Sequence, residues 1–176
     1  MASNSNFERD PRRIQELRGR PIADRIYQSV FGEAISIQRF SHGEDSLLDR
    51  HFAIDVQLNL PNGMILLGQE KFLSYKYASF ATITVEYEQN FHTGEPGDWF
   101  KLAPQFYFVG YGTRNWDDFD PWMLFNWPAV VLATHDGDLL WQLNQNKDGR
   151  ARASFKHSKM RDAPPRCIIA SSFGRS

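Results

Sequence analysis

The stretch HFAIDVQLNLPNGMILLGQEKFLS, residues 51–74, predicts a β-hairpin that helps to build the core. Two apolar-rich runs flank Pro61-Asn62-Gly63, and these residue types suit a type I turn followed by a left-handed glycine and a bulge. Counting outward from this three-residue loop places Asp55 opposite Gln69. A two-residue Asn-Gly turn would instead place Asp55 opposite Glu70, so the turn type decides which side chains meet.

The hairpin divides into an apolar and a polar face because side chains alternate along a strand. The apolar face holds Phe52, Ile54, Val56, Leu58, Leu60, Met64, Leu66 and Phe72. The other face brings Asp55, Gln69 and Lys71 together at the end farthest from the turn, with the small side chain of Ala53 between them. Opposed β-carbons lie about 4.5–5.5 Å apart, so these groups should converge. Both a solvent-facing surface and an active site fit this pattern.

Composition indicates one globular domain. The chain has 176 residues, 41% of them hydrophobic and 14% aromatic, which is enough for a sizeable core. We expect a flexible N-terminus at residues 1–12 and a single domain at residues 13–176. The net charge of -1 does not indicate a polyanion partner, and net charge says nothing about whether basic residues cluster locally.

Several classes of protein do not fit the sequence. The single cysteine, Cys167, excludes an intramolecular disulfide and a zinc site made of cysteines alone. No run approaches the roughly 20 apolar residues of a membrane span, and we expect a cytoplasmic protein without a membrane partner. No phosphate-binding glycine loop ending in Gly-Lys-Ser/Thr is present, which argues against a nucleotide cofactor.

Periodicity predicts the order of the elements. Apolar residues at helical spacing predict helix over residues 13–31, interrupted at Gly19-Arg20-Pro21, with Pro21 opening a second helix and Gly32 capping it. A short strand over 34–40, a loop over 41–50, the hairpin and a strand over 77–89 follow. The remainder reads as a helix running into a strand from Asp98, a strand or strand-to-helix segment over 122–134, and a basic C-terminal strand. The expected fold class is α/β (α+β), with a central mixed sheet and an antiparallel hairpin flanked by helices.

An acid on one hairpin strand, followed on the next by Gln, any residue and Lys, resembles the signature of the PD-(D/E)XK nuclease superfamily. Asp55 in AIDV and Gln69-Glu70-Lys71 in GQEK carry the resemblance. The Gln form is similar to the Mrr-type and resolvase-like branches. The resemblance covers residues 20–75 and implies a restriction-endonuclease-like core. An acid on the preceding helix accompanies the motif in that superfamily, and Asp24 and Glu33 are the candidates.

The resemblance implies a hydrolase: a DNA endonuclease that depends on Mg²⁺ or Mn²⁺. It implies that Asp55 and Gln69 ligate the metal together with the carbonyl oxygen of residue 70, while Glu70, which stands where many relatives carry an apolar residue, stays open as a ligand. Lys71 would position the attacking water and stabilise the charge that develops on the phosphate. Asp24 or Glu33 would hold the site through water or bind a second ion.

A basic C-terminal segment and one loop are the candidate DNA contacts. These candidates are Arg150, Arg152, Lys156 and Lys159, together with Arg114 in the loop over 112–121. Basic residues also protect exposed edge strands, so the segment fits both interpretations. A homodimer is expected because cutting two strands needs two active sites. The alternative function is a catalytically inactive DNA-binding or protein-interaction module on the same scaffold.

Overall fold

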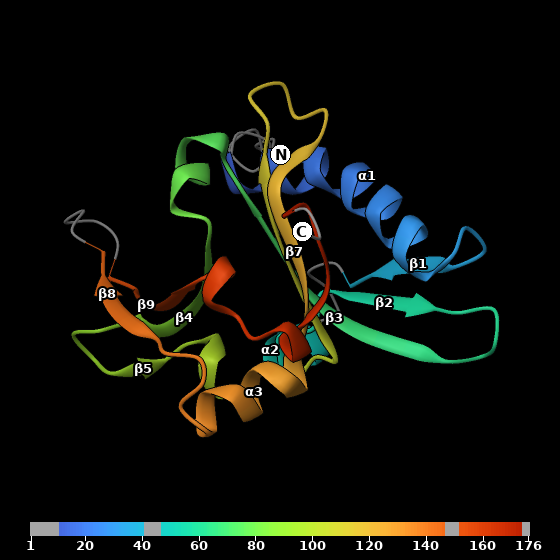
Figure 1. Ribbon diagram of the computed structural model, residues 1–176. Coiled ribbons are helices and arrows are strands. Elements are labelled where there is room, and N and C mark those ends of the chain that lie inside the picture. The colour runs from blue at the N-terminus through green and yellow to red at the C-terminus, as the bar shows by residue number, and fades with distance from the viewer. Residues whose placement is uncertain (1–10, 41–46, 147–151, 174–176) are drawn as a thin grey trace, which may run out of the picture.

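The computed structural model describes residues 11–40, 47–146 and 152–173 (Figure 1). Its helices and strands are α1 (Pro11–Phe31), β1 (Ser36–Arg39), α2 (Leu47–Phe52), β2 (Val56–Asn59), β3 (Ile65–Leu73), β4 (Thr82–Asn90), β5 (Glu95–Pro96), β6 (Phe106–Gly112), β7 (Phe119–Asn126), α3 (Trp127–His135), β8 (Gln142–Gln145), β9 (Ser154–Lys159) and β10 (Ile168–Ser171). Short 3₁₀ turns are η3 (Tyr75–Phe80), η4 (Asp98–Phe100), η5 (Met160–Asp162) and η6 (Pro165–Cys167). The predicted mixed α+β class is confirmed.

The strands form two sheets. The larger sheet has six strands in the order β1-β2-β3-β6-β7-β10, and the smaller has four in the order β5-β4-β9-β8. β3 and β6 are parallel, while the other neighbours in both sheets are antiparallel. α1 packs on one face of the larger sheet, and the smaller sheet and α3 pack on its other face (Figure 1). The central strand β3 is therefore covered on both sides.

The hairpin has the predicted register. Val56 pairs with Gly68, and the Leu60 N–H donates to the Met64 carbonyl at 2.8 Å across the turn. Gly63 has a φ of +82°, the left-handed conformation that the bulged turn requires. The two-residue turn and its Asp55–Glu70 pairing are thereby excluded.

The prediction of two helices before the first strand is wrong, because α1 continues through Gly19-Arg20-Pro21. Gly19 is a packing residue: a β-carbon there would lie 2.6 Å from Cδ2 of Phe72 on β3. Gly19 thus lets the helix approach the sheet closely. The helix also begins at Pro11 rather than near Arg13, whereas residues 1–10 of the expected flexible terminus lie outside the described residues.

Other elements differ from the prediction in detail. Residues 47–50 of the expected loop and the first two residues of the expected hairpin, His51 and Phe52, form α2, while residues 41–46 lie outside the described part. The helix expected from Asp98 is replaced by the three-residue turn η4, and β6 follows it. Pro104 disfavours helix in the residue before it. The segment over 122–134 is strand-to-helix, with Asn126 capping α3. In the described part of the chain, no helix is both long and apolar enough to cross a membrane.

Replacing Gly19 with alanine should destabilise the protein even though alanine is the better helix former by about 1 kcal/mol. The new β-carbon would overlap the Phe72 ring, and overpacking of this kind costs about 1–3 kcal/mol. Urea denaturation should show a lower free energy of unfolding for Gly19→Ala than for the parent. The same substitution in a Phe72→Leu background should cost less, and an equal loss in both backgrounds would contradict the packing explanation.

Candidate active site at the open end of the hairpin

Asp55 is held where the pairing of β2 with β3 ends. Its N–H donates to the Gly68 carbonyl at 2.8 Å, and its Oδ2 accepts the N–H of Glu70 at 3.1 Å. The chain enters this position through Ala53, a buried residue with a φ of +47°. A left-handed conformation costs a non-glycine residue roughly 1–2 kcal/mol, and such strain gathers at functional sites in many proteins.

Gln69 and Lys71 point toward the smaller sheet. They pair with Tyr107 and Val109 of β6, whose side chains belong to the core between the two sheets. Lys71 Nζ donates to the Thr84 carbonyl of β4 at 3.1 Å. The face that carries the predicted residues is therefore covered by β4 and is not a bare solvent-facing surface.

The side-chain oxygen of Gln69 is unusual. Oε1 is buried, and no hydrogen bond reaches it from the part of the chain that the structure describes. A buried acceptor left without a partner costs about 1–3 kcal/mol. A buried oxygen of this kind needs a hydrogen-bond donor or a cation, and the described residues provide neither.

The charges of three other acids affect the pKa of Asp55. Burial raises the pKa of Asp55 to about 7, and the charges of Glu70, Asp49 and Asp98 raise it too, against the lowering effect of the Glu70 N–H. Lys101 connects α2, which carries Asp49, with η4, which carries Asp98. Its Nζ lies 3.1 Å from Asp98 Oδ1 and donates to the Asp49 carbonyl at 3.4 Å. Sequence reasoning missed both acids, because their segments showed only loop and turn signals.

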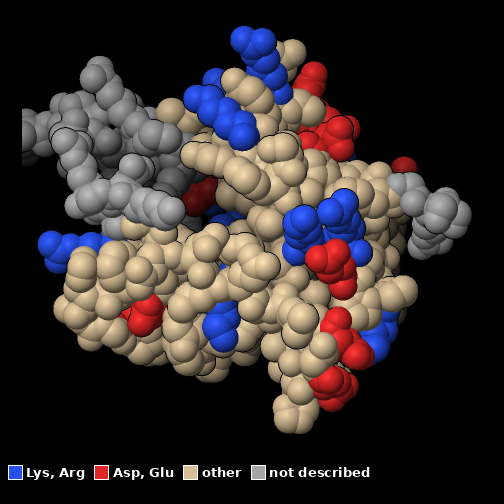
Figure 2. Space-filling model, turned by 60° about the vertical axis from the view of Figure 1, so that its left-hand side comes forward, with Lys and Arg blue, Asp and Glu red and all other residues tan. Residues whose placement is uncertain are grey.

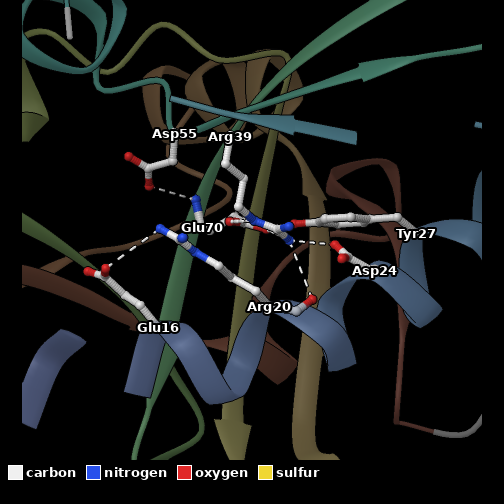
Figure 3. A network of polar contacts seen from close by, with 7 residues as sticks. All are labelled: Glu16, Arg20, Asp24, Tyr27, Arg39, Asp55 and Glu70. Atoms are coloured by element: carbon white, nitrogen blue, oxygen red, sulfur yellow. Dashed lines mark hydrogen bonds and ion pairs between the residues drawn. The ribbon is translucent and has the colours of Figure 1, made fainter. Parts of the chain in front are cut away.

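Glu70 of β3 and Asp24 of α1 meet on the opposite face of the sheet, which α1 covers (Figure 3). Arg39 of β1 donates from Nε to Glu70 Oε2 at 2.8 Å, and from Nη2 to Glu70 Oε1 at 2.9 Å and Asp24 Oδ1 at 2.6 Å. Tyr27 OH donates to Glu70 Oε1 at 3.0 Å. Figure 3 shows the Asp55 carboxylate directed away from this cluster. The pairing with Arg39 and Tyr27 explains why an acid is tolerated at a position only 6% exposed.

These positions correct the predicted roles of three acids. Glu70 cannot ligate a metal beside Gln69, because its carboxylate projects through the other face of β3 and already accepts three hydrogen bonds. Asp24 is bound to Arg39 rather than to the site. Glu33 lies exposed two residues after Phe31, the last residue of α1. Within the described residues, no hydrogen bond or ion pair joins Asp24 or Glu33 to Asp55.

The structure describes four of the five predicted DNA contacts. Arg152 and Lys159 are exposed at the two ends of β9, Arg114 is exposed in the β6–β7 loop, and Arg150 lies outside the described residues. Lys156 is half-buried on β9, and its Nζ lies 4.7 Å from the Tyr87 ring centroid and 4.2 Å from that of Trp99. Figure 2 shows the basic side chains dispersed over the face in view.

Comparison of the chain with protein-family models, curated proteins and solved structures finds no match. No group of three His, Cys, Asp or Glu side chains in the described part is placed to hold a metal ion. The donors available beside Asp55 are instead the amide oxygen of Gln69 and backbone carbonyls, which are oxygen ligands that hard divalent cations accept.

Replacing Asp55 with asparagine should make stability less sensitive to pH. A folded-state pKa near 7, against about 3.9 unfolded, means that Asp55 favours folding in its neutral form. That contribution is complete below about pH 4 and is lost as the pH rises through 7. Between pH 5 and pH 8 the parent should lose about 2–3 kcal/mol more unfolding free energy than Asp55→Asn. Asp162→Asn, which removes an exposed carboxylate, is the control. Parallel curves for parent and Asp55→Asn would contradict the assignment.

Proposed function

We propose that the protein is a metal-dependent DNA endonuclease with a restriction-endonuclease-like core, in which Asp55, Gln69 and Lys71 form the centre of the active site. The observation that carries the proposal is the buried Gln69 Oε1, which has no partner among the described residues. It lies on the strand next to the Asp55 carboxylate and two residues before a lysine on the same face. A structural hairpin gains nothing from an unsatisfied oxygen at that position.

The residues present fit a hard divalent cation. Asp55 provides a charged oxygen and Gln69 a neutral one, and Mg²⁺ or Mn²⁺ completes such a set with water. The negative charges of Asp49 and Asp98 add to the attraction for a cation. When bound, the cation would polarise the scissile phosphate and lower the pKa of a water molecule.

The chain's own groups do the remaining work. The Glu70 N–H fixes the orientation of the Asp55 carboxylate. Lys71 carries a positive charge on the same face as Gln69, where it can stabilise the negative charge that develops on the phosphate during hydrolysis. For this it must exchange the Thr84 carbonyl, its acceptor in this structure, for a phosphate oxygen.

DNA is the proposed partner, and the exposed cations Arg114, Arg152 and Lys159 are the proposed backbone contacts. Cutting both strands would require a homodimer or two successive binding events. Because contacts to phosphates are electrostatic, affinity should depend on salt without a strong sequence preference.

The alternative is a catalytically inactive DNA-binding or protein-interaction module on the same scaffold. Gln69 in place of a carboxylate favours it, as does the lack, in the described ranges, of three clustered metal-binding side chains. A neutral oxygen holds a divalent cation less strongly than a carboxylate does.

Purified protein should nick supercoiled plasmid in Mg²⁺ or Mn²⁺ and lose this activity with EDTA. Asp55→Ala and Lys71→Ala should each lower the rate by about 100-fold or more, because the first removes the charged metal ligand and the second removes the positive charge beside the reacting phosphate. Glu33→Ala, which changes an exposed acid beyond α1, is the matched control and should cut like the parent.

Two outcomes would contradict the nuclease assignment. Cleavage that survives both Asp55→Ala and Lys71→Ala would place the active site elsewhere. A parent that retards DNA in a gel but cuts neither plasmid nor single-stranded oligonucleotide with any divalent metal would favour the inactive module.

A further inference from the structure

Residue 70 connects the two faces of β3. Its side chain is buried beneath α1, whereas its backbone N–H holds the carboxylate of Asp55 (Figure 3). The same residue separates Gln69 from Lys71, so its backbone placement sets where both of those side chains leave the strand. Any group that fixes Glu70 therefore also fixes the three residues of the candidate site.

Glu70 is fixed from two other elements. The Arg39 guanidinium of β1 donates a hydrogen bond to each carboxylate oxygen, and the Tyr27 hydroxyl of α1 donates to one of them. Arg39 is itself held by Asp24, which lies on α1 three residues before Tyr27. Although burial lowers the pKa of Arg39, hydrogen bonds to Glu70 and Asp24 and their charges raise it more, so the guanidinium remains charged.

Stability alone does not account for this arrangement. The neighbours of Glu70 include Phe108 on β6 and Phe72 on its own strand, both in the apolar cluster beneath α1. In such surroundings an apolar side chain stabilises a fold as well as a buried ion pair does. A bidentate ion pair adds directional constraint, since planar guanidinium and carboxylate groups meet in a fixed geometry.

We propose that Glu70, clamped by Arg39 and Tyr27, is a positioning residue that holds Asp55 in place for the divalent metal. The proposal rests on the proposed function, whose site it deepens. Glu70 itself touches neither metal nor DNA. It acts through its backbone N–H on Asp55, and α1 supports the site through Tyr27 and Asp24, which hold Glu70 and Arg39, rather than through an acid beside Asp55.

The test replaces Glu70 with glutamine. Glutamine keeps the shape and one acceptor oxygen, but it loses the charge and one of the two hydrogen bonds from Arg39. Calorimetry should show Mn²⁺ binding weakened by about tenfold or more, the scale expected when a group that orients a metal ligand is removed. The kcat for plasmid nicking should fall by a similar factor, with the KM for DNA unchanged because the DNA contacts lie elsewhere.

Glu16→Gln is the matched control. It makes the same chemical change on α1, in an exposed ion pair with Arg20 at 3.8 Å that has no hydrogen bond to Glu70 (Figure 3). Glu16→Gln should bind Mn²⁺ and cut like the parent. If Glu70→Gln lowers only the melting temperature and matches Glu16→Gln in Mn²⁺ affinity and kcat, Glu70 has no positioning role.

A second variant covers the case in which Glu70→Gln does not fold. Tyr27→Phe removes one hydrogen bond to Glu70 and keeps the ring that packs on Phe106 and Phe108. It should weaken Mn²⁺ binding in the same direction by a smaller factor, about threefold, which corresponds to less than one net hydrogen bond. An unchanged Mn²⁺ affinity in Tyr27→Phe would overturn the proposal.

Hydrogen exchange separates this inference from the nuclease assignment. The amide of residue 70 should exchange faster in Glu70→Gln than in the parent or Glu16→Gln, measured relative to the amide of Phe72. If the parent neither binds Mn²⁺ nor cuts DNA, the proposed function fails, yet faster exchange would still support the clamp on Asp55. Unchanged exchange in a folded Glu70→Gln would overturn the clamp even if Asp55→Ala abolishes cutting.

Discussion

The burial of one carboxylate organises much of this molecule. Glu70 lies in the apolar layer between α1 and the larger sheet, where an unpaired charge would cost several kcal/mol. Its neutralisation requires Arg39 from β1 and Tyr27 from α1 to meet at one point. The docking of α1, the placement of β1 at the sheet edge and the backbone of β3 are therefore mutually dependent. A shift in any of them would leave the carboxylate without a partner.

The candidate site lies on β3, inside the larger sheet, rather than in a surface loop. β3 is hydrogen-bonded to β2 on one side and to β6 on the other, and it is covered on both faces. Alternation along the strand sends Glu70 toward α1 and Gln69 and Lys71 toward the smaller sheet. Sites supported by such rigid elements keep their geometry better than sites on loops.

Local signals predicted the hairpin well. The Pro-Asn-Gly turn determines its register through the left-handed preference of Gly63, a property of three adjacent residues. The grouping of Asp55, Gln69 and Lys71 on one face follows from that register and the two-residue repeat of a strand. The cap at Gly32 and the strand-to-helix change at Asn126 also rest on neighbouring residues, and both were predictable for that reason.

Long-range pairing was not predictable in this way. Arg39 and Glu70 are 31 residues apart, and no local pattern marks them as partners. Asp98 comes close to Asp55 through a connection that runs by way of the smaller sheet. Gly19 was misread for a related reason, because a glycine that breaks a helix and one that lets a helix pack against Phe72 look the same in sequence. In each case the deciding contact comes from a segment distant in the chain.

The Thr84 carbonyl has a consequence for how Lys71 can move. That oxygen accepts hydrogen bonds from both Lys71 Nζ and the Tyr107 hydroxyl, at 3.1 Å and 2.9 Å. If the ammonium turns away toward an incoming anion, Tyr107 still satisfies the carbonyl. The carbonyl is then not left without a partner, which for a buried acceptor would cost about 1–3 kcal/mol. The second bond keeps β4 docked on the larger sheet while one charged side chain changes its partner.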